Sequence, residues 1–346
     1  MKVLENTSLK PFHTFGVEVN AKQVIEAYDK EDFIQIWREQ ASEPKLILGE
    51  GSNMLFCQDF AGTVILNRLK GITKTATDSH WLLHVAGGEN WHRFVSWCLD
   101  NDILGLENLA LIPGLVGSAP IQNIGAYGTD FQMFCDYVEV LLLETGETKR
   151  LTKEQCQFGY RESIFKAELK DKAVVLAVGF KIAKDWQPHI EYGPLSSLAN
   201  EIDFGDKTQG AKAIFARVCE VRQEKLPDPH QIGNAGSFFK NPVVPATLAD
   251  SLLAQYPNMP SYPATSAYTK LAAGWLIEQC GLKGLQLGGA AVHGKQALVL
   301  VNKDNAKAEE VVALARLVIA KVQEKFGVEL HPEVRLWGKT QEISWS

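Results

Sequence analysis

The sequence predicts an α+β protein, because strand-like and helix-like segments follow one another without strict β–α–β alternation. Short apolar runs that end at turn residues indicate strands, mainly in the first half of the chain. Longer runs with apolar residues at helical spacing indicate helices, mainly in the second half. The chain has 346 residues, of which 46% are hydrophobic and 22% charged, a balance typical of folded proteins with about two domains.

The first half is expected to contain strands and one helix. Residues 89–104 predict the helix, since Trp91, Phe94, Val95 and Cys98 recur at helical spacing. A glycine-rich loop follows over residues 112–128. Strands are predicted at 45–49, 63–67, 82–88 and 173–182, with a hairpin over 137–151 that turns at Thr145-Gly146.

The second half is expected to be mostly helical. Residues 185–210 are rich in Pro, Ser, Asn, Asp and Gly, and predict a polar linker. Gly281 and Gly327 predict helix ends, because glycine readily adopts the left-handed conformation that follows a last helical turn. Helices are predicted at 211–225, 247–256, 270–280 and 306–326, and a final strand at 328–337.

Composition limits the classes of partner. The formal net charge of −6 predicts no general attraction to nucleic acid or to acidic membranes, so an anionic ligand needs a local group of cations and backbone N–H groups. The six cysteines are scattered without a CxxC pair, which is typical of free thiols in a reducing compartment. No apolar run reaches the ~18 residues of a membrane helix. We therefore expect a cytoplasmic protein.

Two glycine-rich segments are candidates for phosphate binding. Residues 49–53 (GEGSN) follow a predicted strand, but Met54 stands where a dinucleotide fingerprint has its third glycine. Residues 112–128 contain four glycines that allow backbone N–H groups to approach a ligand closely. Together they fit a pyrophosphate. Taken separately, they are also compatible with a turn between strands and with an ordinary surface loop.

Three side chains are candidates for chemistry. Arg161 lies among aromatic and small residues, where a guanidinium can grip a carboxylate, although a surface ion pair with Glu162 is the simpler alternative. Ser237, in the segment GNAGSFFKNP, stands beside two phenylalanines, and the alternative is a tight turn into a strand. Glu333 lies on the predicted last strand and could be an exposed carboxylate. The eight histidines lack metal-binding spacing, so no metal is expected.

These segments together resemble the UDP-N-acetylenolpyruvoylglucosamine reductase family over nearly the whole chain. The resemblance is carried by residues 49–53, 112–128, 160–165 (YRESIF) and 233–242 (GNAGSFFKNP), and by Lys225-Leu-Pro-Asp-Pro, Lys270-Leu-Ala-Ala-Gly-Trp and Glu333-Val-Arg. The segment Tyr192-Gly-Pro-Leu is similar to the longer (type I) class of the family, in which a tyrosine loop closes over the substrate.

The resemblance implies a two-subdomain FAD-binding fold of the vanillyl-alcohol-oxidase (PCMH) type, with a C-terminal α+β substrate-binding domain. Residues 1–70 and 328–346 would form the first FAD-binding subdomain. Residues 71–210 would form the second, and residues 211–327 the substrate domain.

It also implies the reaction, in which NADPH reduces UDP-N-acetylglucosamine enolpyruvate to UDP-N-acetylmuramate by way of FAD, for peptidoglycan precursor synthesis. Hydride would pass from flavin N5 to the enolpyruvyl methylene, and the adjacent carbon would then be protonated. Arg161 and Glu333 would stabilise the charge that develops beside the carboxylate, and Ser237 would supply the proton. NADPH is the implied co-substrate and the UDP-sugar the partner, with no obligate protein partner.

The implied ligand contacts fall into two sets. FAD would lie along Gly49, Gly51, Ser52, Asn53, Pro113, Gly114, Gly117, Ser118, Asn123, Gly125, Ala126 and Tyr127. The substrate diphosphate would be held by Tyr192, Lys225 and Asn241, and its nucleotide end by Tyr262, Lys270 and Gln296. Two other functions remain open at this point: an FAD-dependent oxidase of the same fold and a non-catalytic module that binds sugar nucleotides.

Overall fold

The structure is a computed structural model, and it describes residues 1–345. The chain divides into two compact units. Unit 1 comprises Met1–Glu5, Gln23–Glu50 and Thr63–Arg222; unit 2 comprises Asn6–Lys22, Gly51–Gly62 and the chain from Gln223 onward. Both contain strands and helices, which confirms the predicted α+β class. The finer division into two FAD-binding subdomains and a substrate domain stays a prediction.

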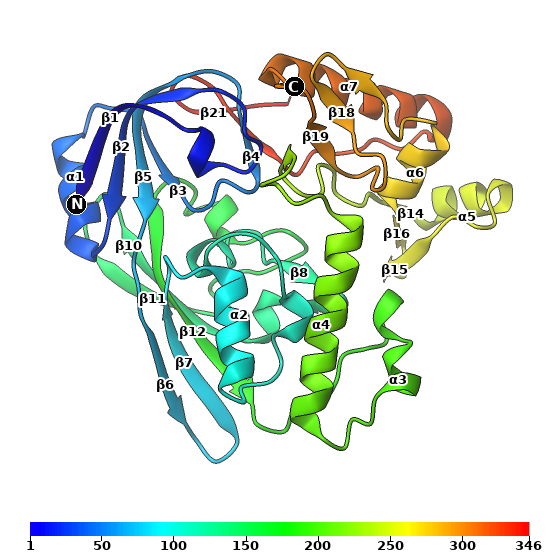
Figure 1. Ribbon diagram of the computed structural model, residues 1–346, viewed down its shortest axis with the longest axis horizontal. Helices are drawn as coiled ribbons and strands as arrows, with labels where there is room; N and C mark the ends of the chain where they lie inside the picture. The colour runs from blue at the N-terminus through cyan, green and yellow to red at the C-terminus, as the bar shows by residue number, and fades with distance from the viewer. Residues whose placement is uncertain (346) are drawn as a thin grey trace. The chain divides into compact units, whose positions relative to one another are not determined.

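The main sheet of unit 1 has five antiparallel strands in the order β11-β10-β12-β7-β6 (Figure 1). The central strand β12 is buried along most of its length, and its Val178 pairs with Val85 on one side and Val138 on the other. The predicted hairpin is formed by β10 and β11. The strands are β6 (Ile72–Ala76), β7 (His80–Ala86), β10 (Cys135–Leu142), β11 (Thr148–Thr152) and β12 (Ala173–Ala183).

Helix α2 (Trp91–Asp100) contributes Trp91 and Phe94 to the unit 1 core. Asn90 begins the helix, because its side chain accepts the Arg93 N–H at 2.9 Å and so satisfies one of the first backbone donors. The cap explains why the helix starts two residues later than the predicted range 89–104, and the helix ends four residues earlier, at Asp100. Phe94 packs against Phe180 of β12 with ring centroids 4.9 Å apart.

A second sheet has the strand order β1-β2-β5-β3, with β1 (Lys2–Ser8), β2 (Asn20–Ala27), β5 (Phe60–Asn67) and β3 (Lys45–Leu48). Strands β1, β2 and β5 each include residues of both units. Strands β3 and β5 are parallel. Helix α1 (Lys30–Glu39) begins at Asp29, whose side chain accepts the Asp32 N–H, and it buries Phe33 and Ile36.

Residues 185–210 do not form the polar linker that the sequence predicted, because the segment is part of the folded core of unit 1. Its apolar residues Trp186, Leu195 and Leu198 are buried in the core of unit 1. Residues 185–206 contain the short helix α3 (Leu198–Glu201) and a 3-10 turn at Gly193–Leu195. Helix α4 (Lys207–Lys225) follows and begins four residues earlier than predicted; its Ala211, Ile214 and Val218 join the same core.

Unit 2 contains three small sheets. The first has the order β13-β19-β18-β17, and helix α7 (Ala308–Phe326) packs against it (Figure 1). The helix ends at Gly327 with a φ of 67°, the left-handed conformation that the sequence predicted. The strands are β13 (Gly233–Asn234), β17 (Gln286–Leu287), β18 (Ala290–Val292) and β19 (Leu300–Asn302).

The second sheet of unit 2 has the order β14-β16-β15, and helix α5 (Ala246–Gln255) contacts it, whereas helix α6 (Ala273–Gln279) contacts α7. Its strands are β14 (Val243–Pro245), β15 (Ser261–Thr265) and β16 (Tyr268–Leu271). The predicted helix 270–280 starts three residues late, because Lys270 and Leu271 pair with β14 and β15 and cannot also be helical.

The third sheet of unit 2 has the order β21-β20-β4, from β4 (Met54–Phe56), β20 (Arg335–Trp337) and β21 (Glu342–Ile343). The predicted strand 328–337 is regular only at its end. Pro332 has no backbone N–H and cannot take part in a regular ladder, so the earlier part forms one isolated bridge with Phe239.

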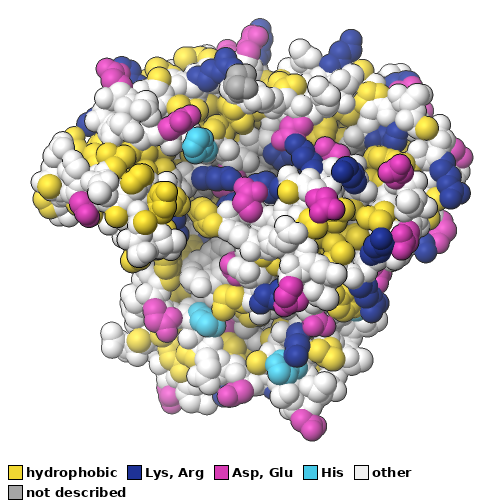
Figure 2. Space-filling view, turned by 180° about the vertical axis from the view of Figure 1, so that it is seen from behind, with side chains coloured by type: hydrophobic (Ala, Val, Ile, Leu, Met, Phe, Trp, Pro, Cys, Tyr) yellow, Lys and Arg dark blue, Asp and Glu magenta, His cyan; other side chains and the backbone are white. Residues whose placement is uncertain are grey.

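None of the helices within residues 1–345 is long and apolar enough to cross a membrane. On the face in Figure 2, Lys and Arg side chains gather near the middle, with Asp and Glu among them. A net negative charge therefore coexists with local positive charge on the surface.

Candidate active site

The glycine-rich loop at 112–128 is packed against the β7–α2 turn of unit 1. Gly117 donates its N–H to the Gly87 carbonyl at 2.8 Å. A Cβ on Gly117 would lie 2.8 Å from that same oxygen, so only glycine fits there. The Gly114 carbonyl accepts the Trp91 N–H at 2.9 Å and thereby ties the loop to the start of α2.

Glu50, which the sequence analysis did not single out, connects the two glycine-rich segments. Its carboxylate accepts the Gly114 N–H at 2.8 Å and the Asn90 side-chain amide at 2.5 Å. The position of a Cβ on Gly49 is 3.6 Å from the side chains of Leu115 and Ser118. Gly49 and the 114–118 part of the loop thus lie together in unit 1, whereas Gly51, Ser52 and Asn53 belong to unit 2.

The far end of the loop is held in a strained backbone. Asn123 is buried, donates to the Gly159 carbonyl at 3.1 Å and accepts the Gln132 N–H at 3.0 Å. Leu111, Asn123, Tyr127 and Arg161 all have positive φ between 43° and 57°, which is uncommon for residues other than glycine. Such strain concentrates at functional sites, and here it surrounds one loop.

Arg161 lies on this strained end of the loop. Its guanidinium donates to the Gly125 carbonyl at 2.9 Å and to the Asn123 carbonyl at 3.4 Å, and it stands 5.3 Å from the centre of the Tyr160 ring. These contacts fix the direction of the guanidinium. Glu162, the ion-pair partner considered in the sequence analysis, forms a 3.1 Å pair with Lys166.

Arg222 is a second arginine near Arg161, and it lies outside the motifs that marked the other candidates in the sequence. Burial lowers the pKa of Arg222, and the nearby charge of Arg161 lowers it further. The signal in the sequence was a charge at four-residue spacing after the buried Ile214 and Val218 of α4, and Arg222 is itself half-buried.

His92 contacts both helix α4 and the residue that precedes the glycine-rich loop. His92 stacks on Phe215 of α4, with ring centroids 5.5 Å apart and an interplanar angle of 12°. Its Nδ1 accepts the Leu111 N–H at 3.1 Å, so the proton of the neutral ring is on Nε2. Burial lowers the pKa of His92 and keeps the ring neutral, which suits its place near Arg222.

Ser237 and Glu333 are neighbours in unit 2, although they are far apart in the chain. The Glu333 N–H donates to the Phe238 carbonyl at 2.8 Å, and the Lys240 N–H donates to the His331 carbonyl at 2.9 Å. Ser237 is exposed and Glu333 half-buried. Phe238 and Phe239, which follow the serine, are both buried in the core.

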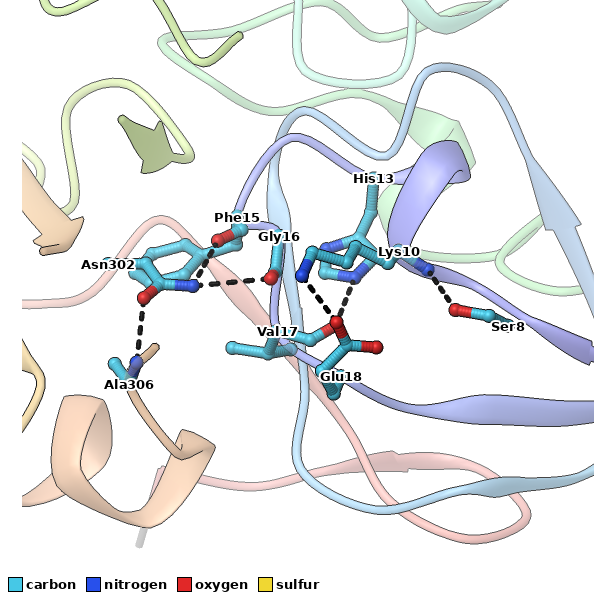
Figure 3. A network of polar contacts seen from close by, with 9 residues as sticks. All are labelled: Ser8, Lys10, His13, Phe15, Gly16, Val17, Glu18, Asn302 and Ala306. Atoms are coloured by element: carbon cyan, nitrogen blue, oxygen red, sulfur yellow. Dashed lines mark hydrogen bonds and ion pairs between the residues drawn. The ribbon is translucent and has the colours of Figure 1, made fainter. Parts of the chain in front are cut away.

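The turn before Ser237 is fixed by backbone contacts around Asn234. Its side-chain oxygen accepts the Gly236 N–H at 2.9 Å, and its backbone carbonyl accepts the Thr14 hydroxyl at 2.6 Å. Gly236 has a φ of 69°, a conformation that favours glycine. The adjoining chain is held by Asn302, whose amide donates to the Phe15 and Gly16 carbonyls at 3.2 Å (Figure 3).

Gly51 lies against His13 in unit 2. Gly51 has a φ of 59°, and a Cβ there would lie 2.5 Å from the His13 Cβ. The His13 Nε2 donates to the Val17 carbonyl at 3.2 Å (Figure 3), while its buried Nδ1 has no partner among the described residues. Burial lowers the pKa of His13 to about 4, so the ring is neutral near pH 7.

The expected substrate residues are distributed over both units. Tyr192, in unit 1, is 42% exposed and lies beside Gly128 at the end of the loop. Lys225 is exposed in unit 2, where Lys270 stands over the Tyr262 ring at 5.8 Å. Asn241 accepts the Ala273 N–H at 3.0 Å at the start of α6, and Gln296 reaches the same turn.

The structure thus describes two groups of site residues. Arg161, Tyr127 and Tyr192 are at one end of the loop in unit 1; Ser237 and Glu333 are adjacent in unit 2. Whether Arg161 joins Ser237 and Glu333 on one substrate stays a prediction.

Two family models match the chain. Residues 21–152 match an FAD binding domain, and residues 228–337 match the C-terminal domain of UDP-N-acetylenolpyruvoylglucosamine reductase. The first contains the loop with Gly114, Gly117 and Tyr127, and the second contains Ser237 and Glu333.

Full-length relatives extend the match. The chain is 53% identical to the UDP-N-acetylenolpyruvoylglucosamine reductase of Photobacterium profundum, over 100% of this chain and 99% of the relative. It is also 53% identical to that of Escherichia coli, over 98% of each chain. The solved structure of the enzyme from Thermus caldophilus is 25% identical, with a TM-score of 0.64 over 97% of this chain and 98% of that one. The chain therefore belongs to the UDP-N-acetylenolpyruvoylglucosamine reductase family.

Proposed function

We propose that this protein reduces UDP-N-acetylglucosamine enolpyruvate to UDP-N-acetylmuramate with NADPH and FAD, in peptidoglycan precursor synthesis. The observation that carries the proposal is identity of about half of the residues to the named reductases over the whole chain. Neither the oxidase nor the binding module has comparable support.

The residues of unit 1 fit FAD. The loop at 112–128 has glycines where a Cβ would collide with backbone, so a ligand can approach the main chain closely. On α4, the Arg222 Nε is buried without a partner among the described residues. When bound, FAD supplies the capacity to accept and donate a hydride.

The protein's own residues would bind the substrate and move one proton. Arg161 would contact the enolpyruvyl carboxylate, where two guanidinium N–H groups match two carboxylate oxygens. Glu333 would share a proton with the same group as charge develops on it. Ser237 would donate a proton to the carbon adjacent to the new C–H bond, in a site that the bound substrate keeps dry.

Substrate orientation would rest on the remaining polar residues. Tyr192, Lys225 and Asn241 are proposed for the diphosphate, and Tyr262, Lys270 and Gln296 for the nucleotide end. Asn241 also caps the start of α6, so its substitution would affect both folding and binding. The cytoplasmic location stays a prediction from the cysteine pattern.

The experiment is an anaerobic titration of the purified protein. The protein should be yellow, should lose its flavin absorbance with one equivalent of NADPH, and should recover it with UDP-N-acetylglucosamine enolpyruvate. A colourless protein that cannot be reconstituted with FAD would contradict the proposal.

A further inference from the structure

The 3-10 turn at Glu107–Leu109 is a buried polar centre of unit 1. All three of its residues are buried, Asn108 completely. The Asn108 side-chain amide donates to the His189 carbonyl at 2.8 Å and to the Tyr127 carbonyl at 3.0 Å, so both of its N–H donors are used. These partners lie 81 and 19 positions away along the chain, within the same unit. One side chain therefore ties together two segments that carry candidate site residues.

The other end of the Asn108 side chain shows that packing alone does not account for an asparagine here. Its Oδ1 is buried and has no hydrogen-bond partner among residues 1–345. An unpaired buried oxygen costs free energy, and a leucine would fill a similar volume without that cost. What the asparagine provides, and an apolar residue cannot, is the pair of hydrogen bonds to Tyr127 and His189.

Residues 190–194 form a short exposed segment directly after His189, which we call the Tyr192 arch. Before the arch, Trp186 is buried, and its Nε1 donates to the Glu107 carboxylate of the same 3-10 turn. After the arch, Leu195 is completely buried in the core of unit 1. Tyr192 itself is 42% exposed. The arch is thus held at both ends and exposed in the middle.

The Tyr192 arch lies beside the Tyr127 end of the glycine-rich loop. A Cβ on Gly128 would be 3.5 Å from the Tyr192 Cβ, and Gly128 directly follows Tyr127 in the chain. The two hydrogen bonds of Asn108 therefore fix the base of the arch relative to the loop residues beside the tyrosine. Because a short segment with fixed ends leaves its central side chain little freedom, the position of these ends determines where the tyrosine ring can lie.

The consequence for binding rests on the proposed function, in which Tyr192 contacts the substrate diphosphate. A hydroxyl bonds an oxygen only at about 2.7–2.8 Å, so a displaced arch would weaken this contact. An arch that is ordered before the substrate arrives also loses less conformational entropy on binding. We propose that Asn108 is a positioning residue for substrate binding, which places the Tyr192 arch against the Tyr127 end of the loop. Since Asn108 is completely buried, it acts through Tyr192.

The test is a double-mutant cycle on substrate affinity. The Kd of UDP-N-acetylglucosamine enolpyruvate is measured from the change in flavin absorbance of the oxidised protein, without NADPH. Asn108→Leu should raise the Kd about 10-fold, because a misplacement of about 1 Å can cost up to about 100-fold. In the Tyr192→Phe protein, which already lacks the hydroxyl, Asn108→Leu should change the Kd by less than about 2-fold.

Asn101→Leu is the matched control. Asn101 belongs to the same unit, and its side-chain amide donates to the Trp97 carbonyl at 2.9 Å, at the end of its own helix α2. This substitution also removes an amide-to-carbonyl hydrogen bond, but one that does not hold the base of the Tyr192 arch. The Kd should therefore be unchanged by it, both in the wild type and in Tyr192→Phe.

The cycle has clear contrary results. An equal rise of the Kd in both backgrounds would show that loss of Asn108 damages the fold in general, and would overturn the proposal. An unchanged Kd in Asn108→Leu or in Tyr192→Phe alone would overturn it too, because the asparagine would then have no effect or no tyrosine to act through. If Asn108→Leu does not retain FAD, Asn108→Ser takes its place in the cycle with the same criteria.

The same measurements separate this inference from the proposed function. The affinity cycle needs no turnover, so it can fail while the wild-type protein turns over normally. Failure of the proposed function would appear in the wild type, as bound substrate that does not reoxidise the reduced flavin. A wild-type protein that does not bind the substrate would overturn both.

Discussion

Ser237 illustrates how a weak acid can be placed for proton donation. The turn around Asn234 fixes its backbone, and Phe238 and Phe239 anchor the chain that follows in the core. The hydroxyl itself is exposed in the protein without ligands. Its role therefore depends on the substrate to exclude water from the site.

Ser237→Ala should leave the reduction of FAD by NADPH nearly unchanged, since the serine acts only on the substrate. Reoxidation by the enolpyruvyl substrate should slow by ~10²- to 10⁴-fold, the usual contribution of a general acid. Stopped-flow absorbance of the flavin measures both steps, and Ser79→Ala in the β6–β7 turn is the control. Equal slowing of both steps would instead indicate that the serine positions the cofactor.

Arg161 and Glu333 should act on one developing charge. Truncation of either one should cost ~2.7–4 kcal/mol in the substrate half-reaction, the scale measured for lost oxyanion donors. The double variant should cost less than the sum, and Arg161→Lys should restore only part of the rate. Arg150→Ala, which removes an exposed pair with Glu139, is the control. Additive costs would mean that the two residues act independently.

His13 should make stability depend on pH. Its pKa falls from 6.5 to about 4 in the folded protein, so the unfolded chain binds more protons between these values. The contribution of His13 to the free energy of unfolding is therefore complete above pH 6.5. It is lost as the pH falls to 4, and the loss is about 3 kcal/mol for this shift.

Urea unfolding at a series of pH values measures this effect. His13→Gln should be less stable at pH 7, and its stability should fall less steeply between pH 6.5 and 4 than that of the wild type. His230→Gln, at an exposed position, should follow the wild-type curve. An unchanged slope in His13→Gln would show that other groups cause the acid sensitivity.

At the scale of elements, the predictions that succeeded rest on local signals. Gly327 ends α7 because glycine accepts the left-handed conformation, and that property is visible in the sequence alone. The start of α6 was misplaced because Lys270 and Leu271 belong to β16, a choice made by pairing with distant strands. Buried apolar residues in a polar stretch, such as Trp186, were missed for the same reason.

The turn at Gly51 can be tested as an element. In Gly51→Ala the residue would have an unfavourable φ, and its new Cβ would lie 2.5 Å from the His13 Cβ. In Gly281→Ala the φ is also unfavourable, but no atom lies within 4 Å of the new Cβ. Gly281→Ala should cost ~1 kcal/mol, and Gly51→Ala a further ~1–3 kcal/mol from overpacking. Denaturant unfolding measures both. Equal losses would mean that the chain around His13 yields easily.

At the scale of the whole molecule, local motifs in the sequence indicated where to look for the candidate site. Residues 112–128 and 233–242 were recognisable because glycine and small residues mark places where a backbone approaches a ligand. Glu50 was not, because its role depends on Gly114, a partner 64 positions away that only the fold brings near.

We propose that electrons pass in this protein from NADPH through FAD to an enolpyruvyl sugar nucleotide. The most direct measurement is flavin absorbance in an anaerobic cuvette, first with one equivalent of NADPH and then with one equivalent of UDP-N-acetylglucosamine enolpyruvate. We predict full bleaching, then full recovery with formation of one equivalent of UDP-N-acetylmuramate. Flavin that stays reduced with the enolpyruvyl substrate, yet is reduced by a sugar or alcohol and reoxidised by oxygen, would contradict the account.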